Sequence, residues 1–324
     1  MARYLITGVA GFIGSNIAHA LIDQGEEVRG IDDFSHGRWE NIGDIVRKID
    51  FREVDITDKR AIRSACDGVD YILHQAALGS VPRSLADPIA TNEANVAGTL
   101  RVLEAAREAG VKRVVYASSS SVYGNTPTLP KQEHMPLNPI SPYAVSKCAG
   151  ELYCRSFYNV LGLETVCLRY FNVFGPRQHP TSQYAAVIPK FIRLMLNGER
   201  PAIFGDGRQS RDFTYVDNVV SANLLACHAP AHKASGRSFN IAAGKSFSLN
   251  ELYSLLQQIT GCTAPPLYAP ERKGDVRDSL ADTTEALQAL GYRTLIEFRE
   301  GLRKTVEWYK CEFAGQMSPV LGSA

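Results

Sequence analysis

The sequence predicts an α/β protein built on a doubly wound parallel sheet, with a smaller α/β domain in its carboxyl-terminal half. Three observations predict this class. Apolar, strand-like runs alternate with helical patterns over the first 170 residues, three closely spaced glycines follow the first run, and the alternation gives way to shorter pieces after Gly175. Parallel strands need helical crossovers between them, so this alternation favours a parallel sheet.

The elements of the first half are regular. Six parallel strands are expected at 4–6, 27–31, 51–54, 71–74, 113–117 and 165–169. Helices are expected at 15–21, from Asp58 onward, at 92–108 and at 142–161. Together they predict a nucleotide-binding domain over residues 1–175.

The second half reads as a substrate domain over residues 176–314, followed by a loose tail at 315–324. Its expected helices are 187–196, 217–227, 249–259, 283–290 and 296–309, separated by brief strands such as 202–204 and 239–241. The chain could cross back to the sheet near 215–245. We expect this domain to cover the carboxyl ends of the strands, where open α/β sheets bind ligands.

The first strand runs directly into Gly8, Gly11 and Gly14, in GxxGxxG spacing. Glycine suits a tight turn in which the backbone approaches a pyrophosphate and the helix N-terminus meets its charge. The second strand ends in Asp32 and Asp33, about 20 residues further on, where a carboxylate can accept a ribose 2′-hydroxyl and repel a 2′-phosphate. A Rossmann-type site for NAD rather than NADP is therefore predicted. The plain alternative is a glycine-rich turn without a ligand.

Composition excludes several classes of function. The chain has 324 residues, 35 basic and 34 acidic side chains and a formal net charge of +1, so neither nucleic acid nor a membrane surface is an expected partner. No apolar segment is long enough to span a bilayer and no signal peptide precedes the first strand, which predicts a cytoplasmic protein. The seven cysteines have no metal-binding spacing, so we expect reduced thiols and no metal site.

Tyr143 and Lys147 stand four residues apart on a predicted helix and therefore share one face. A nearby ammonium and a positively charged nicotinamide ring would both lower the pKa of the Tyr143 phenol, making it a general base near neutral pH. The preceding strand ends in the hydroxyls of 118–121, where the reactive end of a cofactor is expected. A surface Tyr/Lys pair and a polar loop are the ordinary alternatives. The order of glycine turn, hydroxyls and YxxxK favours an active site.

With these motifs the chain resembles the extended short-chain dehydrogenase/reductases, specifically the NAD-dependent epimerase/dehydratase family and its UDP-hexose 4-epimerases. The similarity spans residues 3–310. It is carried by GVAGFIG (8–14), HQAA (74–77), NVAGT (95–99), SSSSVYG (118–124), SPYAVSK (141–147), LRYFNVFGPRQ (168–178), SRDFTYVDNV (210–219) and KGDVRDSLAD (273–282).

The resemblance implies a mechanism with Ser119, Tyr143 and Lys147 as the catalytic residues. Tyr143 would take the proton of the sugar 4-hydroxyl, assisted by Ser119, while the C4 hydride passes to NAD and returns to the other face of the sugar. Lys147 would bind the cofactor ribose. NAD would be regenerated in place and therefore tightly held.

The resemblance also implies two sets of binding residues. Those for NAD are Gly8, Gly11, Phe12, Ile13, Gly14, Asp32, Asp33, Phe34, Ser35, Gly37, Asp55, Ile56, Gln75, Ala76, Ala77, Asn95, Ser118, Tyr143, Lys147 and Tyr170. Those for a UDP-sugar are Gly79, Ser80, Ser119, Tyr143, Asn172, Gln178, Ala186, Val187, Arg211, Arg272, Asp275 and Ser279. Arg211 and Arg272 would clamp the diphosphate, because guanidinium groups match its charge and geometry.

A homodimer is expected on the same basis. The helices at 92–108 and 142–161 match the pair that forms a four-helix interface in relatives, and they carry Leu100, Leu103, Leu152 and Phe157. Packing against the sheet predicts much of the same pattern.

The resemblance separates the sister reactions of the family. Dehydratases carry Asp-Glu directly after the catalytic Ser or Thr, and decarboxylases usually keep a Glu at the second of these positions. This chain has Ser120 and Ser121 there, which favours epimerisation. An NAD-binding sensor without turnover is the alternative of a different class, but such proteins typically lack the YxxxK pair.

Ser279 aligns with the family's gate, a pocket position where tyrosine limits some members to UDP-glucose and UDP-galactose. The small residue predicts interconversion of UDP-N-acetylglucosamine and UDP-N-acetylgalactosamine. A UDP-glucose 4-epimerase with an open gate is the first alternative. A UDP-glucuronate 4-epimerase is another, because Arg83 and Arg177 lie near the pocket motifs and could meet a C6 carboxylate.

Overall fold

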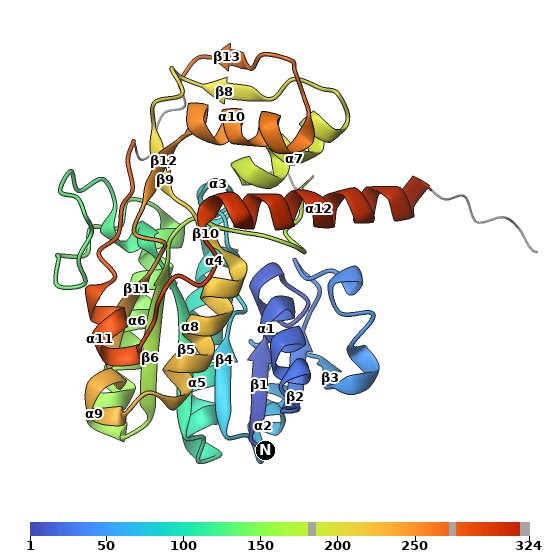
Figure 1. Cartoon of the computed structure of the whole chain (residues 1–324). Helices are drawn as coiled ribbons and strands as arrows, with labels where there is room; N and C mark the ends of the chain where they lie inside the picture. Colours follow the sequence, from blue (N-terminus) through green and yellow to red (C-terminus); the bar gives the residue numbers. More distant parts are fainter. Residues whose placement is uncertain (181–185, 272–276, 318–324) are drawn as a thin grey trace, which may run out of the picture.

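The computed structural model of the chain describes residues 1–180, 186–271 and 277–317 (Figure 1). Its centre is a seven-stranded parallel sheet in the order β11-β6-β5-β4-β1-β2-β3. The strands are β1 (Arg3–Thr7), β2 (Glu27–Asp32), β3 (Asp50–Glu53), β4 (Tyr71–His74), β5 (Arg113–Ser119), β6 (Glu164–Tyr170) and β11 (Arg237–Ile241). The predicted doubly wound parallel sheet is confirmed.

The seventh strand corrects the sequence reading, which counted six parallel strands and treated 239–241 as a brief strand of the second half. β11 pairs with β6 in parallel over its whole length, from Arg237 opposite Val166 to Ile241 opposite Tyr170. The chain thus returns to the sheet after building part of the second unit. The domain boundary at residue 175 stays a prediction.

Helices bury their apolar stripes on both faces of the sheet. One apolar cluster joins α1 (Phe12–Asp23), α8 (Val216–His228) and α11 (Thr284–Leu290) to the first face. A second cluster joins α2 (Lys59–Cys66), α5 (Gly98–Glu108) and α6 (Pro142–Leu161) to the other. Short elements complete this half: η1 (Trp39–Asn41), η2 (Val46–Lys48), α3 (Val81–Ala86), α4 (Pro88–Asn92), η4 (Ser120–Tyr123) and α9 (Ala231–Ala234).

The helix expected at 92–108 is longer and irregular. α4 runs into a π-helical segment, η3 (Glu93–Ala97), and then into α5. The segment contains Asn95, whose side chain accepts from Leu78 N (2.7 Å) and donates to Ser146 Oγ (3.0 Å). A π-helical turn commonly marks a functional position, and here it turns a polar side chain toward the loop after β4.

The second unit lies above the carboxyl ends of the strands (Figure 1). Its helices are α7 (Val187–Leu196), α10 (Leu249–Thr260) and α12 (Phe298–Met317), and its strand pairs are β7 (Val173–Phe174) with β10 (Thr214–Tyr215), β9 (Ser210–Asp212) with β12 (Ser246–Ser248), and β8 (Ala202–Phe204) with β13 (Leu267–Ala269). Phe174, Phe213 and Phe298 meet in its core. α12 continues through residues 315–317, which the sequence analysis assigned to the tail.

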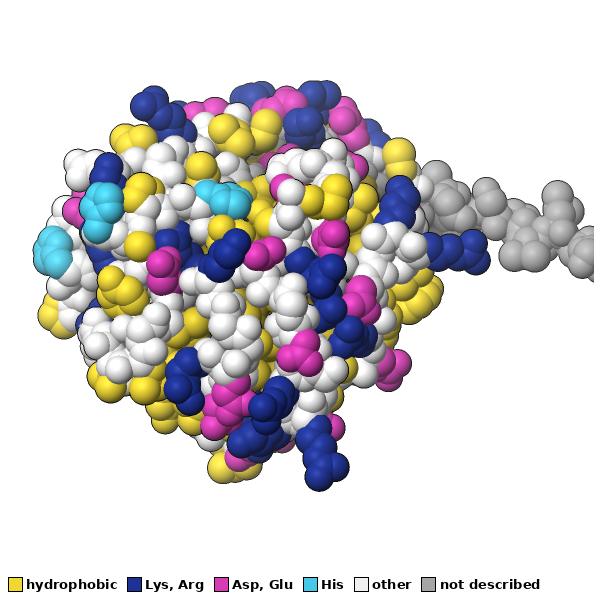
Figure 2. Space-filling view, turned by 90° about the horizontal axis from the view of Figure 1, so that it is seen from below, with side chains coloured by type: hydrophobic (Ala, Val, Ile, Leu, Met, Phe, Trp, Pro, Cys, Tyr) yellow, Lys and Arg dark blue, Asp and Glu magenta, His cyan; other side chains and the backbone are white. Residues whose placement is uncertain are grey.

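The surface carries no single-sign patch on the face at the amino ends of the strands, where basic and acidic side chains intermingle (Figure 2). Among the helices that the structure describes, none has the length and apolarity needed to cross a membrane. Nor does any group of His, Cys, Asp and Glu in the described residues have a geometry that could hold a metal ion.

Candidate active site

The glycine turn between β1 and α1 is closely packed. A Cβ atom on Gly14 would lie 2.1 Å from Gly8 O, and one on Gly8, whose φ is +71°, would lie 2.8 Å from Ala76 N and Cα. Gly11 is the N-cap of α1 and offers no side-chain cap, so the first N–H groups of the helix are left for an anion. This geometry fits the pyrophosphate of a dinucleotide.

Asp32 closes the turn at the end of β2. Its buried carboxylate accepts from Ala10 N and Phe34 N, both at 2.9 Å. Burial raises the pKa of Asp32, and the two backbone N–H groups counteract it. A Cβ atom on Gly37 would lie 2.4 Å from Asp32 Oδ1, so the loop after β2 folds back onto the carboxylate. Asp33 instead accepts from Ser35 N and Oγ in the same loop.

The remaining residues predicted for NAD line the ends of the neighbouring strands. Gln75 donates to Asn223 Oδ1 (3.0 Å), and Asn223 donates to the Tyr170 hydroxyl (2.8 Å). Ile56 packs closely against Gly98: a Cβ atom added to Gly98 would lie 2.6 Å from Ile56 Cδ1. Ser118, Asp55, Ala76 and Ala77 all follow or end a strand of the sheet, as expected. Ser118 is turned away, because its hydroxyl donates to Glu151.

The three predicted catalytic residues lie together. Ser119 ends β5, and its hydroxyl is hydrogen-bonded to the phenol of Tyr143. Ser141 caps α6 through Ala144 N and Pro142 takes the first position of the helix, which places Tyr143 in its first turn. Lys147 follows one turn later and donates to Ala117 O at 2.7 Å, with Nζ 5.9 Å from the centre of the Tyr143 ring.

The electrostatics differ from the sequence-based expectation. Burial raises the pKa of the Tyr143 phenol, and the hydrogen bond with Ser119 lowers it. Lys147 is not among the causes that shift the Tyr143 pKa in the chain alone. Burial also lowers the pKa of Lys147, to about 8, so the ammonium is largely protonated at neutral pH. Any further lowering of the Tyr143 pKa depends on a positive charge brought by the cofactor.

Two residues of the predicted sugar pocket are joined directly. Asn172 Nδ2 donates to Ser279 Oγ and to Asp212 O, both at 3.0 Å, and Asp212 N also donates to Ser279 Oγ (3.2 Å). Asn172 has a positive φ of 34°, which turns its side chain toward these partners. The predicted gate residue is thus fixed by two donors.

The other residues predicted for the substrate are dispersed over three segments. Ser80 caps α3 by accepting from Arg83 N, next to the exposed Gly79, while Ala186 and Val187 begin α7. Gln178 donates to Val173 O (3.1 Å), and Arg211 donates to Ser210 O and Arg277 O. No hydrogen bond among the described residues joins Gly79, Ser80, Gln178, Ala186 or Val187 to the Asn172–Ser279 pair. Arg272 and Asp275 lie outside the described residues.

Sequence reasoning missed Asp212, which the structure places directly behind the pocket. Its fully buried carboxylate accepts from Ala243 N, Gly244 N and Ala281 N at 3.0–3.1 Å. Burial raises the pKa of Asp212 to about 6, against the effect of these N–H groups. The sequence feature that could have identified Asp212 is its position, directly after Arg211 and before an apolar stretch.

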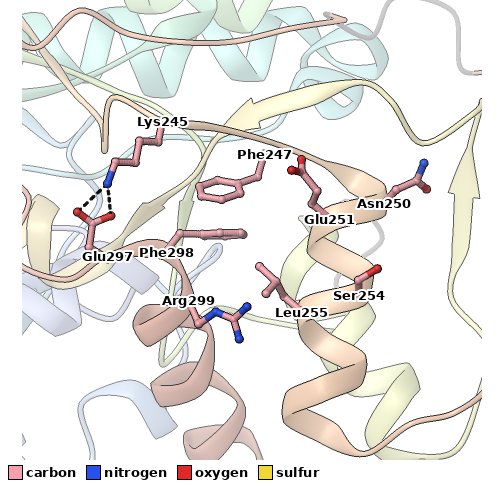
Figure 3. Close-up of a pocket in the computed structure, with 9 residues that line it drawn as sticks. All are labelled: Lys245, Phe247, Asn250, Glu251, Ser254, Leu255, Glu297, Phe298 and Arg299. Atoms are coloured by element: carbon pink, nitrogen blue, oxygen red, sulfur yellow. Dashed lines mark hydrogen bonds and ion pairs between the residues drawn. The ribbon is translucent and has the colours of Figure 1, made fainter.

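A hollow of about 600 Å³ lies elsewhere, between α10 and the start of α12 (Figure 3). Phe247 and Phe298 lie side by side in it, with ring centres 4.3 Å apart. Its charged groups are already partnered: Lys245 pairs with Glu297, Glu251 accepts from Ser248, and Arg299 donates to Gln258. None of the predicted site residues lines it, so it is not the catalytic pocket.

Comparison with known families agrees with the geometry. The model of the NAD dependent epimerase/dehydratase family matches residues 4–242. The chain belongs to this family. A UDP-glucose 4-epimerase of Mycolicibacterium smegmatis is 41% identical over 312 residues, which cover 95% of this chain and 98% of that protein.

Solved structures of family members superpose closely. The UDP-glucose 4-epimerase of Thermotoga maritima, solved with UDP-glucose, has a TM-score of 0.91 at 38% identity and covers 96% of this chain and 99% of its own. A UDP-N-acetylglucosamine 4-epimerase of Methanobrevibacter ruminantium, in complex with UDP-N-acetylmuramic acid, has a TM-score of 0.90 at 40% identity with the same coverage. The UDP-glucose 4-epimerase of Thermus thermophilus, in complex with NAD, has a TM-score of 0.85 at 34% identity and covers 95% and 99%.

This epimerase/dehydratase family member is therefore an NAD-dependent enzyme of the UDP-sugar 4-epimerase group. The glycine turn and the Asp32 carboxylate fit the cofactor. The individual site residues stay predictions, which the following two substitutions test.

Gly14→Ala should greatly reduce retention of NAD, because the added methyl group meets backbone atoms that cannot turn aside. The cofactor content of the purified protein, measured by chromatography after denaturation, checks this. Gly43→Ala is the matched control, since its Cβ would make only ordinary contacts with Trp39. Full NAD content in the Gly14 variant would show that the cofactor does not use this turn.

Tyr143→Phe should lower turnover by about 100- to 10,000-fold, the usual contribution of a general base, while NAD stays bound. Turnover of the UDP-sugar and cofactor content are measured on the same preparation. Tyr153→Phe, on the exposed side of the same helix, is the control and should keep its activity. An active Tyr143 variant would remove this residue as the base.

Proposed function

We propose that this enzyme interconverts UDP-N-acetylglucosamine and UDP-N-acetylgalactosamine. The observation that carries the proposal is the wall formed by Ser279 and Asn172. The serine is small and 9% exposed, and it is fixed by two hydrogen bonds rather than by packing of a large side chain. Such a wall leaves room for the acetamido group at C2 of the sugar.

The grouping of the predicted catalytic residues Ser119, Tyr143 and Lys147 supports epimerisation. Bound NAD would supply the oxidising power at C4 of the sugar. Tyr143 holds and releases the proton of the 4-hydroxyl, and the Ser119 hydroxyl, bonded to the phenol, completes the path for this proton. The Lys147 ammonium beneath the ring favours the phenolate. The 4-keto sugar then turns over in the pocket and takes the hydride on its other face.

The segment after Ser119 supports epimerisation over elimination or decarboxylation. Ser120 and Ser121 begin η4, and Ser121 N donates to Ser119 Oγ at 3.2 Å. Neither residue can act as the carboxylate acid or base that the sister reactions use. The backbone N–H here holds the catalytic hydroxyl in place.

UDP-glucuronate is the less favoured substrate. Arg83 Nη1 is hydrogen-bonded to His36 Nδ1 (2.9 Å), and Arg177 Nη1 donates to Asn16 Oδ1 (3.0 Å). These partners lie in the loop after β2 and on α1, so both guanidinium groups are engaged on the cofactor side of the fold. UDP-glucose and UDP-galactose fit the same open pocket and remain the second candidate pair.

The direct test is an assay of the purified protein on UDP-N-acetylglucosamine, UDP-glucose and UDP-glucuronate, without added reductant, with the 4-epimers resolved by chromatography. Faster conversion of the acetylated sugar supports the proposal. Conversion of UDP-glucose alone would keep the reaction and reject the reading of the pocket. Conversion of none would favour an NAD-binding sensor.

Ser279→Tyr should selectively lower kcat/KM for the acetylated sugars by about 10- to 100-fold, as expected for steric exclusion from a pocket. The kcat/KM ratio of acetylated to plain sugar measures it. Ser279→Ala should keep the ratio high, because it preserves the space, and Ser254→Tyr, exposed on α10, is the matched control. An equal loss on both sugars in the tyrosine variant would contradict the gate.

We also propose a homodimer formed through the two helices expected from the sequence, 92–108 (η3 and α5) and 142–161 (α6), together with α4, which directly precedes the first of them. The structure divides the four residues named from the sequence: Leu103 and Phe157 are buried in the core against the sheet, Leu100 is partly buried against the same cluster, and Leu152 is 56% exposed. Ile89, Val145 and Val160 are exposed as well, at 72%, 51% and 76%. A second copy would cover this apolar face.

Leu152→Glu should convert the dimer to a monomer, because the interface would have to bury an unpaired carboxylate. Sedimentation velocity gives the mass directly. Leu295→Glu, equally exposed but on the loop before α12, is the control and should stay dimeric. A Leu152 variant that remains dimeric would place the interface elsewhere.

A cytoplasmic role in nucleotide-sugar metabolism, supplying polysaccharide biosynthesis, belongs to the same proposal. Five of the seven cysteines are buried and all seven are free thiols. Free thiols are typical of a reducing compartment. NAD and UDP-sugars are found in the same compartment.

A further inference from the structure

Lys147 is a buried cation that lacks an acidic partner. The residue is 4% exposed, and Nζ makes one hydrogen bond, to Ala117 O. Glu151 stands one turn further along α6, but its two oxygens accept from Arg169 Nε and Nη2 and from the hydroxyls of Ser118 and Ser238. Across residues 1–180, 186–271 and 277–317, no ion pair includes Lys147. A buried charge without such a pair needs another source of stabilisation.

Tyr116 supplies an aromatic face at this point. It lies on β5 with 1% exposure, and the Lys147 Nζ atom is 5.1 Å from the centre of its ring, closer than to the ring of Tyr143. An ammonium within about 6 Å of a ring centre is attracted by the negative face of the ring. The attraction grows when water is excluded, as it is here.

The hydroxyl of Tyr116 does not explain its presence. Tyr116 Oη is buried without a hydrogen-bond partner in the described residues, which costs free energy. A Cβ atom on Gly150 would lie 2.2 Å from Tyr116 Oη, so the glycine leaves space for the ring beneath α6. The ring, and not the hydroxyl, is what this position uses.

We propose that Tyr116 is a positioning residue of the active site, whose ring face keeps the Lys147 ammonium charged and in place beneath Tyr143. The proposal holds for any substrate that the enzyme turns over, so it does not depend on the sugar. It adds to the predicted catalytic residues a positioning residue on β5 that acts through Lys147.

The other titratable groups around Lys147 do not replace this contact. Tyr143, Glu151 and Cys154 on α6 and His74 on β4 surround Lys147, and Cys167 on β6 lies near Tyr116. Burial, with the Lys147 charge, lowers the pKa of His74 to about 3, so its ring is neutral. A hydrogen bond with Cys154 and burial raise the pKa of the Cys167 thiol, which is neutral too. Glu151 is paired with Arg169 and acts on Lys147 only through space, where its charge raises the Lys147 pKa against the larger effect of burial.

The consequence is a pH dependence. Removing the ring destabilises the Lys147 ammonium relative to the neutral amine, so the Lys147 pKa falls. As the pH is raised, the variant should therefore lose activity at a lower pH than the wild type does. In Tyr116→Leu we expect the alkaline limb of kcat to move down by about one pH unit, equivalent to about 1.4 kcal/mol. Tyr116→Phe keeps the ring and should keep the limb.

The experiment uses the NAD-loaded enzyme. The pH profile of kcat is measured for wild type, Tyr116→Leu and Tyr116→Phe, with Tyr4→Leu as a control for removing a buried tyrosine from the same sheet. In parallel, the ε-carbon resonance of Lys147 is titrated by NMR in lysine-labelled protein and assigned with Lys147→Arg. This second readout needs no turnover, so failure of the proposed function and failure of the inference are distinguishable.

Fluorinated phenylalanines at position 116 keep the test valid if the leucine variant does not fold. Successive fluorination changes the shape of the ring little but reduces the negative charge on its face. The pH midpoint of the Lys147 NMR titration should therefore fall stepwise from Tyr116→Phe to Tyr116→pentafluorophenylalanine. A midpoint that is unchanged across this series, or that shifts as much in the phenylalanine variant as in the leucine variant, would overturn the proposal.

Discussion

The buried ion pair between Glu151 and Arg169 fixes the catalytic helix. Both residues are at most 3% exposed, and Arg169 also donates to the Tyr123 hydroxyl at 2.7 Å. Through Ser118, Arg169 and Ser238 the Glu151 carboxylate is bonded to β5, β6 and β11. Burying two charges costs several kcal/mol each, which these hydrogen bonds offset, so the pair contributes geometry more than stability. It holds α6 at one rotation against the face of the sheet, and Tyr143 and Lys147 with it.

The opposite wall of the site is fixed by smaller polar links. His74 bridges the Thr7 hydroxyl (2.7 Å) and the Thr99 hydroxyl (3.0 Å), joining β1, β4 and α5 at the edge where the glycine turn begins. Thr7 Oγ1 also accepts from Ala76 N. The backbone that Gly8 must approach is thereby held in place. Cofactor and catalytic helix are set by two separate networks that meet at the carboxyl edge of the sheet.

Local patterns in the sequence predict local features well. The six strands, the glycine turn and the Tyr143–Lys147 spacing follow from residues adjacent in the chain, and the structure contains each of them. A return of the chain to the sheet near 215–245 was expected, but β11 was not identified as its seventh strand, because that depends on pairing with β6, some 70 residues earlier. The sequence did not predict Tyr116 or Asp212 as site residues for the same reason, since their partners Lys147 and Ser279 are distant in sequence. For the Tyr143 pKa, the spacing does not reveal burial, which raises it in the chain alone, so the predicted lowering depends on the charge of the bound cofactor and stays a prediction.

The proposed wall of the sugar pocket shows how a small side chain can be held by the backbone. Ser279 Oγ accepts one hydrogen bond from a main-chain N–H and one from Asn172, while Asp212 ties the loops on either side. A tyrosine at position 279 would lose both hydrogen bonds and would also fill the space beside the serine. The size of this side chain and its hydrogen bonding to the backbone therefore change together. Since the hydroxyl oxygen is used twice as an acceptor, its proton is the group that remains to face a ligand. Specificity at this position is therefore a property of three chain segments together, and not of one small residue.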